Sequence, residues 1–161
     1  MQVHPELLQA QRLPEALHHD KEKLWQHRYE AIRNYEKYLT ENGIEVIKYY
    51  LHVSKKEQKE RLLARLNNPN KNWKFEAQDV QERAFWHDYR KVYENVIAET
   101  ATEYAPWYIV PADDKKNMRL LVAHILRKRL QNLPLAMPQV DETQKALLVQ
   151  FKTQLESQDD D

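Results

Sequence analysis

The sequence predicts an α/β protein in which helices dominate and flank a small parallel sheet. Two short segments rich in β-branched and aromatic residues, 46–53 and 107–110, are the expected strands. Segments with the apolar spacing of helices precede, separate and follow them, and this order is typical of a parallel α/β arrangement. Two short strands do not make an independently stable sheet. The sequence therefore predicts part of a larger α/β domain.

The first long helix is expected from Asp20 to about Asn42. Asp20 is a favourable N-cap residue. Gly43, the single glycine of the chain, suits the left-handed position that ends a helix. The larger side chains between these two positions recur at helical spacing: Trp25, Tyr29, Ile32, Tyr35 and Leu39.

The segment 54–75 combines a helix start with a concentration of positive charge. Ser54, with Glu57 three residues later, forms a capping box, and the Asn-Asn-Pro turn that follows is expected to stop the helix. Arg61 and Arg65 are four residues apart and share one helix face. We expect a mobile basic arm that closes over a chain of phosphates; the alternative is a solvated helix surface. Its cations are Lys55, Lys56, Lys59, Arg61, Arg65, Lys71 and Lys74.

Two further helices are expected on either side of the second strand. One runs from about 76 to 100, and the other follows the loop 111–115, PADDK, with Asp113 or Asp114 as its N-cap. Three tryptophans are expected to pack rather than to stack on a base: Trp73, Trp86 and Trp107. Two carboxylates, Glu82 and Asp88, are expected to be surface charges.

Residues 136–161 are expected to form a C-terminal extension. Pro134 and Pro138 mark a linker, and the segment after it is weakly amphipathic. The acidic residues 159–161 are expected to be disordered.

The composition excludes several classes of protein. A formal net charge of +0 argues against a dedicated nucleic-acid or membrane-surface binder. The absence of cysteine removes disulfides and thiolate chemistry, and the seven histidines show no metal-binding spacing. No apolar run approaches the length of a membrane span, and residues 1–17 lack the apolar core of a signal peptide. A cytoplasmic location is therefore expected.

Any phosphate chemistry of this chain must work without a glycine-rich loop. A G-x-x-x-x-G-K-[ST] or G-x-G-x-x-G segment brings backbone N–H groups close to phosphates, and a chain with one glycine contains neither. Phosphates must therefore be bound by side-chain cations, or by a loop supplied from elsewhere.

Five motifs together resemble a known family. They are RYE-x-I at 28–32, LHVSKKEQKERLLARL at 51–66, NPNKNWKF at 68–75, ERAFWHDY at 82–89 and APWYIVPADDK at 105–115. In this order and at this spacing they look like the C-terminal half of the type-2 polyphosphate kinases. The resemblance covers roughly residues 2–135.

The resemblance implies a partial P-loop-kinase-like sheet with a helical lid. Members of this family transfer phosphoryl groups between inorganic polyphosphate and AMP or ADP, with ATP as a further nucleotide partner, and they form homo-oligomers. Their P-loop and acidic metal-binding motif precede the point where this chain begins. Mg²⁺ is therefore expected only through a motif outside these residues, and the isolated chain is expected to be inactive.

The resemblance also implies roles for individual residues. Residues 1–135 correspond to the family domain and about 54–75 to its lid. Arg61 or Arg65 is the expected transition-state cation, since guanidinium binds phosphate oxygens in a bidentate manner and stays charged. The lid residues Lys71 and Lys74 are expected to bind polyphosphate.

The loop after the second strand is the other candidate. Asp113 and Lys115 are expected near the nucleotide, because ligands gather at the carboxyl ends of parallel strands. Two functions remain open: a phosphotransferase present as its C-terminal portion, or a non-catalytic module that binds polyphosphate or docks on a full-length relative. Nucleic-acid binding is disfavoured by the neutral charge.

Overall fold

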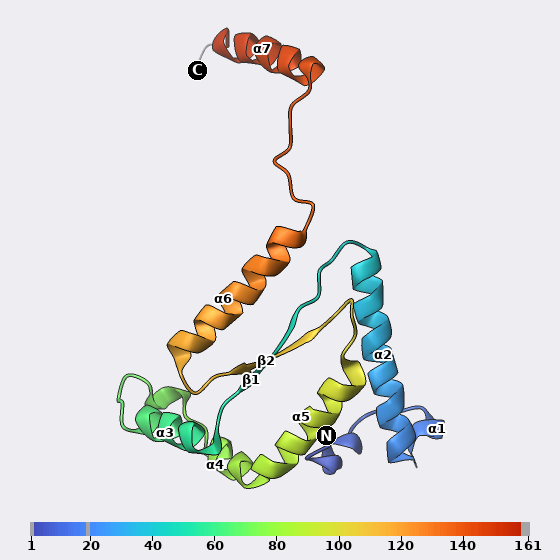
Figure 1. Cartoon of the computed structure of the whole chain (residues 1–161), viewed down its shortest axis with the longest axis vertical. Helices are drawn as coiled ribbons and strands as arrows, with labels where there is room; N and C mark the ends of the chain where they lie inside the picture. Colours follow the sequence, from blue (N-terminus) through green and yellow to red (C-terminus); the bar gives the residue numbers. More distant parts are fainter. Residues whose placement is uncertain (1, 19, 159–161) are drawn as a thin grey trace. The chain divides into compact units, whose positions relative to one another are not determined.

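The computed structural model describes residues 2–18 and 20–158, and it divides into two compact units after Val122. Its elements confirm the predicted helix-dominated α/β order (Figure 1). In chain order they are η1 Pro5–Leu8, α1 Glu15–His18, α2 Lys21–Glu41, β1 Lys48–His52, α3 Lys55–Leu66, η2 Asn72–Lys74, α4 Ala77–Glu82, η3 Arg83–Phe85, α5 Trp86–Thr100, β2 Trp107–Pro111, α6 Lys115–Asn132 and α7 Glu142–Glu156.

Helix α2 begins and ends where the sequence predicts. The Asp20 carboxylate accepts a hydrogen bond from the Lys23 N–H at 3.0 Å, and Gly43 has a φ of 81°, the left-handed conformation that glycine adopts at little cost. The helix packs on α5 (Figure 1). The predicted stripe is only partly inward, because Tyr29 is buried whereas Tyr35 is 63% exposed.

Strands β1 and β2 form the predicted parallel pair. Lys48 lies opposite Trp107, and His52 lies opposite Pro111. The ladder extends past both ends of the strands: the Lys48 N–H donates to the Pro106 carbonyl at 3.1 Å, and the Ala112 N–H donates to the His52 carbonyl at 2.8 Å. In the described residues these are the two strands of the sheet, so the expectation of a partial sheet is confirmed.

A buried polar cluster closes the amino end of the sheet. The Lys48 ammonium lies 2.6 Å from a Glu36 carboxylate oxygen and 2.7 Å from the Thr100 carbonyl. Its side chain is 13% exposed and that of Glu36 is 9% exposed. The Trp107 indole N–H donates to the Thr100 hydroxyl at 2.9 Å. These bonds join α2, α5 and both strands.

The long helix predicted over 76–100 is interrupted. Helix α4 ends at Glu82, the 3₁₀ turn η3 follows, and α5 begins at Trp86. Tertiary bonds on both sides of the turn account for the break: Arg83 donates to the Lys55 carbonyl and to Gln58, while the Glu82 carboxylate accepts from Tyr89. Helical periodicity alone does not reveal such contacts.

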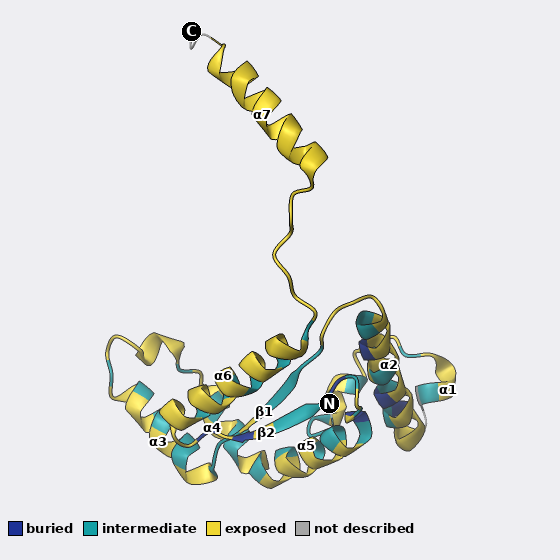
Figure 2. Cartoon of the chain, turned by 45° about the horizontal axis from the view of Figure 1, so that its top comes forward, coloured by how far each residue is buried: buried dark blue, intermediate teal, exposed yellow. Residues whose placement is uncertain are grey.

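The second unit contains the end of α6, a linker and α7. The Asp141 carboxylate caps α7 by accepting from the Gln144 N–H at 2.8 Å. Residues 141–156 are exposed (Figure 2), so the segment predicted to be weakly amphipathic forms a helix whose apolar residues are not buried in the described chain. The predicted disorder of 159–161 lies outside the described residues. Among the described helices, none combines the length and the apolarity that crossing a bilayer requires.

Candidate functional site

The candidate site lies where the carboxyl ends of β1 and β2 lead into α3 and α6. The Ser54 N–H, at the start of α3, donates to the Asp113 carboxylate at 2.7 Å. The loop after β2 is thereby tied to the first turn of α3, the helix of the predicted lid. Helices α3 and α6 therefore both begin beside the same edge of the sheet. The amino end of a helix favours negative charge.

The capping box predicted at Ser54 forms only in part. The Ser54 hydroxyl accepts from the Glu57 N–H at 3.1 Å, as the motif requires. The Glu57 carboxylate, however, accepts from the Arg61 side chain at 2.7 Å. Asp113, from a distant part of the chain, takes the place that Glu57 was expected to fill.

The adjacent residues Asp113 and Asp114 bind different parts of the chain. Asp114 caps α6 by accepting from the N–H groups of Lys116 and Asn117, at 2.8 and 3.2 Å. Hydrogen bonds from Ser54, followed by the nearby Arg61 charge, hold the pKa of the Asp113 carboxyl below its usual range. Asp113 therefore stays an anion that holds the lid helix, and it is unsuited to proton donation near neutral pH.

Arg61 is held at the same junction by three protein oxygens. Its guanidinium donates to the Ala112 and Asp113 carbonyls at 2.6 and 2.9 Å, in addition to Glu57. The side chain is 28% exposed. The structure therefore brings the predicted residues Arg61 and Asp113 together, but through the backbone of the β2–α6 loop.

Arg65 points instead toward the residues that follow the Asn-Asn-Pro turn. It donates to the Lys74 carbonyl and to the Asp79 carboxylate, both at 3.3 Å. It thus braces the segment that follows the Asn-Asn-Pro turn. Arg61 and Arg65, predicted to share a helix face, contact different parts of the chain.

The lid tip presents its cations to solvent. Lys71 and Lys74 are exposed, and the Lys74 ammonium lies 4.8 Å from the centre of the Trp73 ring. Trp73 is 75% exposed, so its predicted packing role is wrong. Lys115, at the start of α6, is also exposed. Trp107 packs as predicted, with its indole N–H bonded to Thr100.

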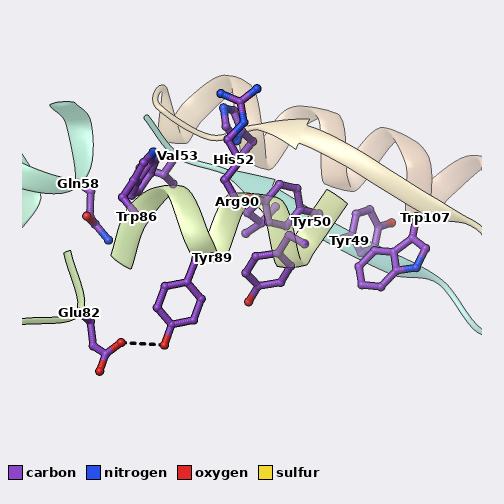
Figure 3. Close-up of a pocket in the computed structure, with 12 residues that line it drawn as sticks. Tyr49, Tyr50, His52, Val53, Gln58, Glu82, Trp86, Tyr89, Arg90 and Trp107 are labelled. Carbon is purple, nitrogen blue, oxygen red and sulfur yellow. Dashed lines mark hydrogen bonds between the residues drawn. The ribbon is translucent and has the colours of Figure 1, made fainter. Parts of the chain in front are cut away.

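An aromatic cavity of about 620 Å³ lies beside this junction, against β1 and α5 (Figure 3). Two of its polar residues, His52 and Arg90, were not among the predicted site residues. The signal for His52 was its position as the last residue of a strand. The apolar and aromatic wall is formed mainly by Tyr50, Leu51, Trp86, Tyr89, Tyr93 and Trp107.

Glu82, expected to be an ordinary surface charge, is the centre of a hydrogen-bonded network at the cavity rim. It accepts from Tyr89 at 2.8 Å and lies 2.9 Å from His4 (Figure 3 shows the Tyr89 bond). The hydrogen bonds from His4, Tyr89 and Gln78 lower the pKa of Glu82 to about 2. The same carboxylate raises the pKa of Tyr89 to about 12 and raises the pKa of His4.

The described residues offer no complete metal site. Within 2–18 and 20–158, no three histidine, aspartate or glutamate side chains are grouped so that they could hold a metal ion. The carboxylates nearest the junction already have protein partners: Asp113 holds Ser54, and Glu57 holds Arg61.

The fold and this junction define a partial P-loop-kinase-like domain, and comparison with known proteins identifies the family. The model for "Polyphosphate kinase 2 (PPK2)" matches residues 15–137. The chain belongs to the polyphosphate kinase 2 family.

Individual relatives support this membership. An ADP-polyphosphate phosphotransferase of Rhodopseudomonas palustris is 42% identical over 155 residues, which are 96% of this chain and 53% of the relative. A Leptolyngbya boryana protein, described as an uncharacterized protein in the chlN 3′ region, is 47% identical over 136 residues, 84% of this chain and 100% of that protein. The chain thus spans about half the length of the Rhodopseudomonas phosphotransferase.

A solved structure agrees with the described fold. The crystal structure of polyphosphate kinase 2 from Arthrobacter aurescens TC1 superposes with a TM-score of 0.71 at 42% sequence identity. The match covers 77% of this chain and 46% of the Arthrobacter chain.

Proposed function

We propose that this chain supplies the lid and one wall of a phosphotransferase that moves phosphoryl groups between inorganic polyphosphate and AMP or ADP. Membership of the polyphosphate kinase 2 family supports the reaction class. The single structural observation behind the proposal is the junction at Ser54 and Asp113, where a basic lid helix is tied to the carboxyl ends of two parallel strands.

Charge at the lid favours a polyanionic substrate. Lys71 and Lys74 project from the tip without an ion pair among the described contacts, and Lys55, Lys56 and Lys59 line the exposed side of α3. We assign Lys71 and Lys74 to attracting polyphosphate and neutralising it. Lysine suits this role because its ammonium is a flexible point charge that tolerates successive phosphate positions.

Arg61 and Arg65 are assigned to the reacting phosphoryl group. Both guanidinium groups are bound to protein oxygens in this structure. Phosphate oxygens carry more negative charge than the carbonyls of Ala112 and Lys74, so a bound polyphosphate can displace these contacts. Lid closure would then consist of an exchange of partners by the arginines, and it would place positive charge where the transition state needs it.

The β2–α6 loop is assigned to the nucleotide side. Lys115 is exposed beside the strand ends, where ligands of open α/β sheets bind. Asp113 contributes by holding the lid helix through Ser54, and its contact with the nucleotide stays a prediction. No group of three carboxylate or histidine side chains in the described residues could hold Mg²⁺, so a bound ion would need ligands from outside them.

A second candidate is a non-catalytic polyphosphate-binding module. The observation that favours it is that both lid arginines are satisfied by internal partners while the lysines are exposed. Such a chain would bind polyphosphate electrostatically and transfer nothing. The homo-oligomeric state implied by the resemblance is part of the proposal, and sedimentation of the purified chain tests it. The cytoplasmic location, expected from the sequence, stays a prediction.

One assay separates the two candidates. The chain, alone and together with the remaining part of a full-length relative, is incubated with polyphosphate, ADP or AMP, and Mg²⁺, and both nucleotide products and polyphosphate binding are measured. Product formation that falls about 10²–10³-fold in Arg61→Ala supports the phosphotransferase. Binding without product from either nucleotide, also when the remaining part of the relative is present, supports the module.

The lid assignment has a matched control. Lys71→Ala/Lys74→Ala is expected to weaken polyphosphate binding and to reduce its salt dependence, since fewer counterions are released. Lys145→Ala/Lys152→Ala removes the same charge from exposed positions on α7 and is expected to leave binding unchanged. If the two double variants weakened polyphosphate binding equally, the assignment of Lys71 and Lys74 to polyphosphate binding would be wrong.

A further inference from the structure

We infer that Glu82 and Arg83 are positioning residues for the lid: they hold the place where the chain returns from it, and the lid tip swings about this place when polyphosphate binds. The inference deepens the proposed function, on which it rests, because it names the residues that aim the lid cations. Three observations carry it: the lack of buried residues in the lid, the interruption between α4 and α5, and the hydrogen bonds of Glu82 and Arg83.

The lid segment is held by polar contacts and not by a core. None of the described residues of α3, η2, α4 and η3 is buried. Segments with few buried contacts are among the least stable parts of a folded chain, and they move at a low cost in free energy. The position of the lid therefore depends on the hydrogen bonds at its two ends. At the first end these are the Ser54–Asp113 bond and the contacts of Arg61.

The boundary between the moving and the fixed part lies between α4 and α5. Helix α4 is tied to the lid, because Arg65 donates to the Asp79 carboxylate at 3.3 Å. Helix α5 is tied to the strands instead, through the bond from the Lys48 ammonium to the Thr100 carbonyl at 2.7 Å. The 3₁₀ turn η3 interrupts the helical path from α4 to α5 (Figure 1). A 3₁₀ turn within a helical stretch often marks a hinge.

Arg83 joins the two ends of the lid at this hinge. Its Nη1 atom donates to the Lys55 carbonyl at 3.0 Å and to the Gln58 side chain at 2.7 Å. Both acceptors belong to the first turn of α3, where the chain enters the lid. Hydrogen bonds from a charged donor are stronger than those between neutral groups. Arg83 therefore keeps the first turn of α3 next to η3 and closes the base of the lid.

Glu82 fastens this base to the rest of the chain. Its carboxylate accepts from Tyr89 on α5 at 2.8 Å (Figure 3) and lies 2.9 Å from His4, which precedes η1. The His4 ring also packs edge-on against Phe85 of η3, with 5.0 Å between the ring centres. The side chains of Glu82 and His4 are 28% and 20% exposed, so solvent screens their contact only in part. With its pKa lowered to about 2, Glu82 stays a charged acceptor at neutral pH.

The contacts farther along the lid are easier to exchange. Arg61 and Arg65 donate to protein oxygens that a phosphate can replace. Glu82 cannot make such an exchange, because a carboxylate repels polyphosphate. Binding of polyphosphate therefore releases α3 from the β2–α6 loop and leaves the base of the lid in place, so that the lid turns about a fixed point.

Distances between two labels test this hinge in the full chain. The chain has no cysteine, so Asn34→Cys on α2 and Asn70→Cys at the lid tip, both exposed, take one spin label each. Without polyphosphate, Glu82→Ala and Arg83→Ala are expected to broaden the distribution of label distances. With polyphosphate, the mean distance is expected to shift in the labelled chain that keeps Glu82 and Arg83. Both variants are expected to bind polyphosphate about tenfold more weakly, because a loosened lid must be ordered on binding.

Matched variants separate the hinge from effects of charge and of general destabilisation. Glu41→Ala and Lys37→Ala each remove a charge of the same sign from an exposed ion pair on α2, and they are expected to change neither the label distances nor the affinity. Tyr89→Phe removes a single hydrogen bond to Glu82 and is expected to broaden the distances less than Glu82→Ala does. Arg83→Lys keeps a charged donor and is expected to recover part of the affinity lost in Arg83→Ala. These two milder variants keep the test open if an alanine variant fails to fold.

Three results would overturn the inference. The first is a distribution of label distances that stays unchanged in Glu82→Ala, Arg83→Ala and Tyr89→Phe. The second is polyphosphate binding without a shift of the mean distance. The third is a weaker salt dependence of binding in Arg83→Ala, because Arg83 would then contact the phosphates directly.

The outcomes for the hinge and for the proposed function are distinguishable. If the variants broaden the distances but the chain binds no polyphosphate, the positioning role of Glu82 and Arg83 stands and the polyphosphate assignment falls. If polyphosphate binds through Lys71 and Lys74 while the label distances do not respond to Glu82→Ala, the function stands and the inference falls.

Discussion

Charged side chains hold both ends of the β1–β2 pair, but they differ in how far solvent can reach them. At the amino end, the Lys48 ammonium lies 2.6 Å from Glu36, and both side chains are nearly excluded from solvent. At the carboxyl end, the exposed Asp113 accepts from the Ser54 N–H, and Arg61, whose side chain is 28% exposed, donates to backbone carbonyls. The same kinds of groups are thus sealed at one end and accessible at the other.

This difference indicates where the molecule is rigid and where it can exchange partners. A buried ion pair that loses one member leaves an uncompensated charge, so the amino end has one stable arrangement. Contacts in reach of water are weaker because solvent screens them, and a phosphate can replace a carbonyl there. The comparison therefore assigns a structural role to the Lys48 end, and it agrees with the ligand-binding role proposed for the Arg61 end.

The largest predicted effect breaks the sealed end. Lys48→Met leaves Glu36 buried without its cation and is expected to lower the free energy of unfolding by about 3–5 kcal/mol. Urea unfolding followed by circular dichroism measures this. Lys48→Met/Glu36→Leu removes both charges and is expected to recover much of the loss. A loss below about 1 kcal/mol in the single variant would show that the end is not sealed.

The accessible carboxyl end of the strand pair should lose less stability when its contacts are removed. Arg61→Met is expected to cost about 1 kcal/mol in the same unfolding assay, because water can hydrate the carbonyls of Ala112 and Asp113 once the guanidinium is gone. Polyphosphate binding or transfer should fall much more than stability does. A stability loss as large as that of Lys48→Met, with unchanged polyphosphate binding, would make Arg61 a structural residue.

A smaller effect tests the turn that leads into β1. Gly43 has a φ of 81°, and an added Cβ would meet nothing within 4 Å. Gly43→Ala should therefore cost only the backbone strain, about 1 kcal/mol, with polyphosphate binding unchanged. Gly43→Asn should cost less, since asparagine tolerates the left-handed region. Equal losses for alanine and asparagine would point to a contact other than backbone strain.

Much of the fold could be predicted because its signals are local. Asp20 and Gly43 mark the ends of α2, and short runs of β-branched and aromatic residues mark both strands. The partial sheet followed from counting those strands. The break at Arg83–Phe85 could not be predicted, because Arg83 donates to Lys55 and Gln58, which are distant in sequence.

Prediction of the candidate site from the sequence was limited in the same way, and more strongly. Sequence spacing selected Arg61, Arg65 and Asp113 through charge and family motifs, but it could not show that each is held by the protein itself. The Ser54 box looked complete from four residues, yet Asp113, 59 positions away, supplies one of its bonds. Trp73 was expected to pack because tryptophan usually does, and the lid instead exposes it.

The smallest predicted effect is a pH dependence at the cavity rim, on the accessible side of the comparison. His4 faces Glu82 and Glu6, and these carboxylates raise its pKa above the ordinary value of 6.5. Protonated His4 is therefore favoured in the folded chain. Its contribution to stability is fully present below pH 6.5 and is lost as the pH rises through the folded pKa.

The measurement is the urea midpoint of the chain and of His4→Gln from pH 5.5 to 9. Subtracting the two curves cancels the other histidines, and the difference is expected to shrink as the pH rises above 6.5. Glu82 does not interfere in this range, because its pKa of about 2 means that its contribution is lost only as the pH falls below 4.5 toward that value. A difference that stays constant across pH 6.5–9 would show that the His4–Glu82 contact does not depend on charge, and the rim would then resemble the sealed end rather than the accessible one.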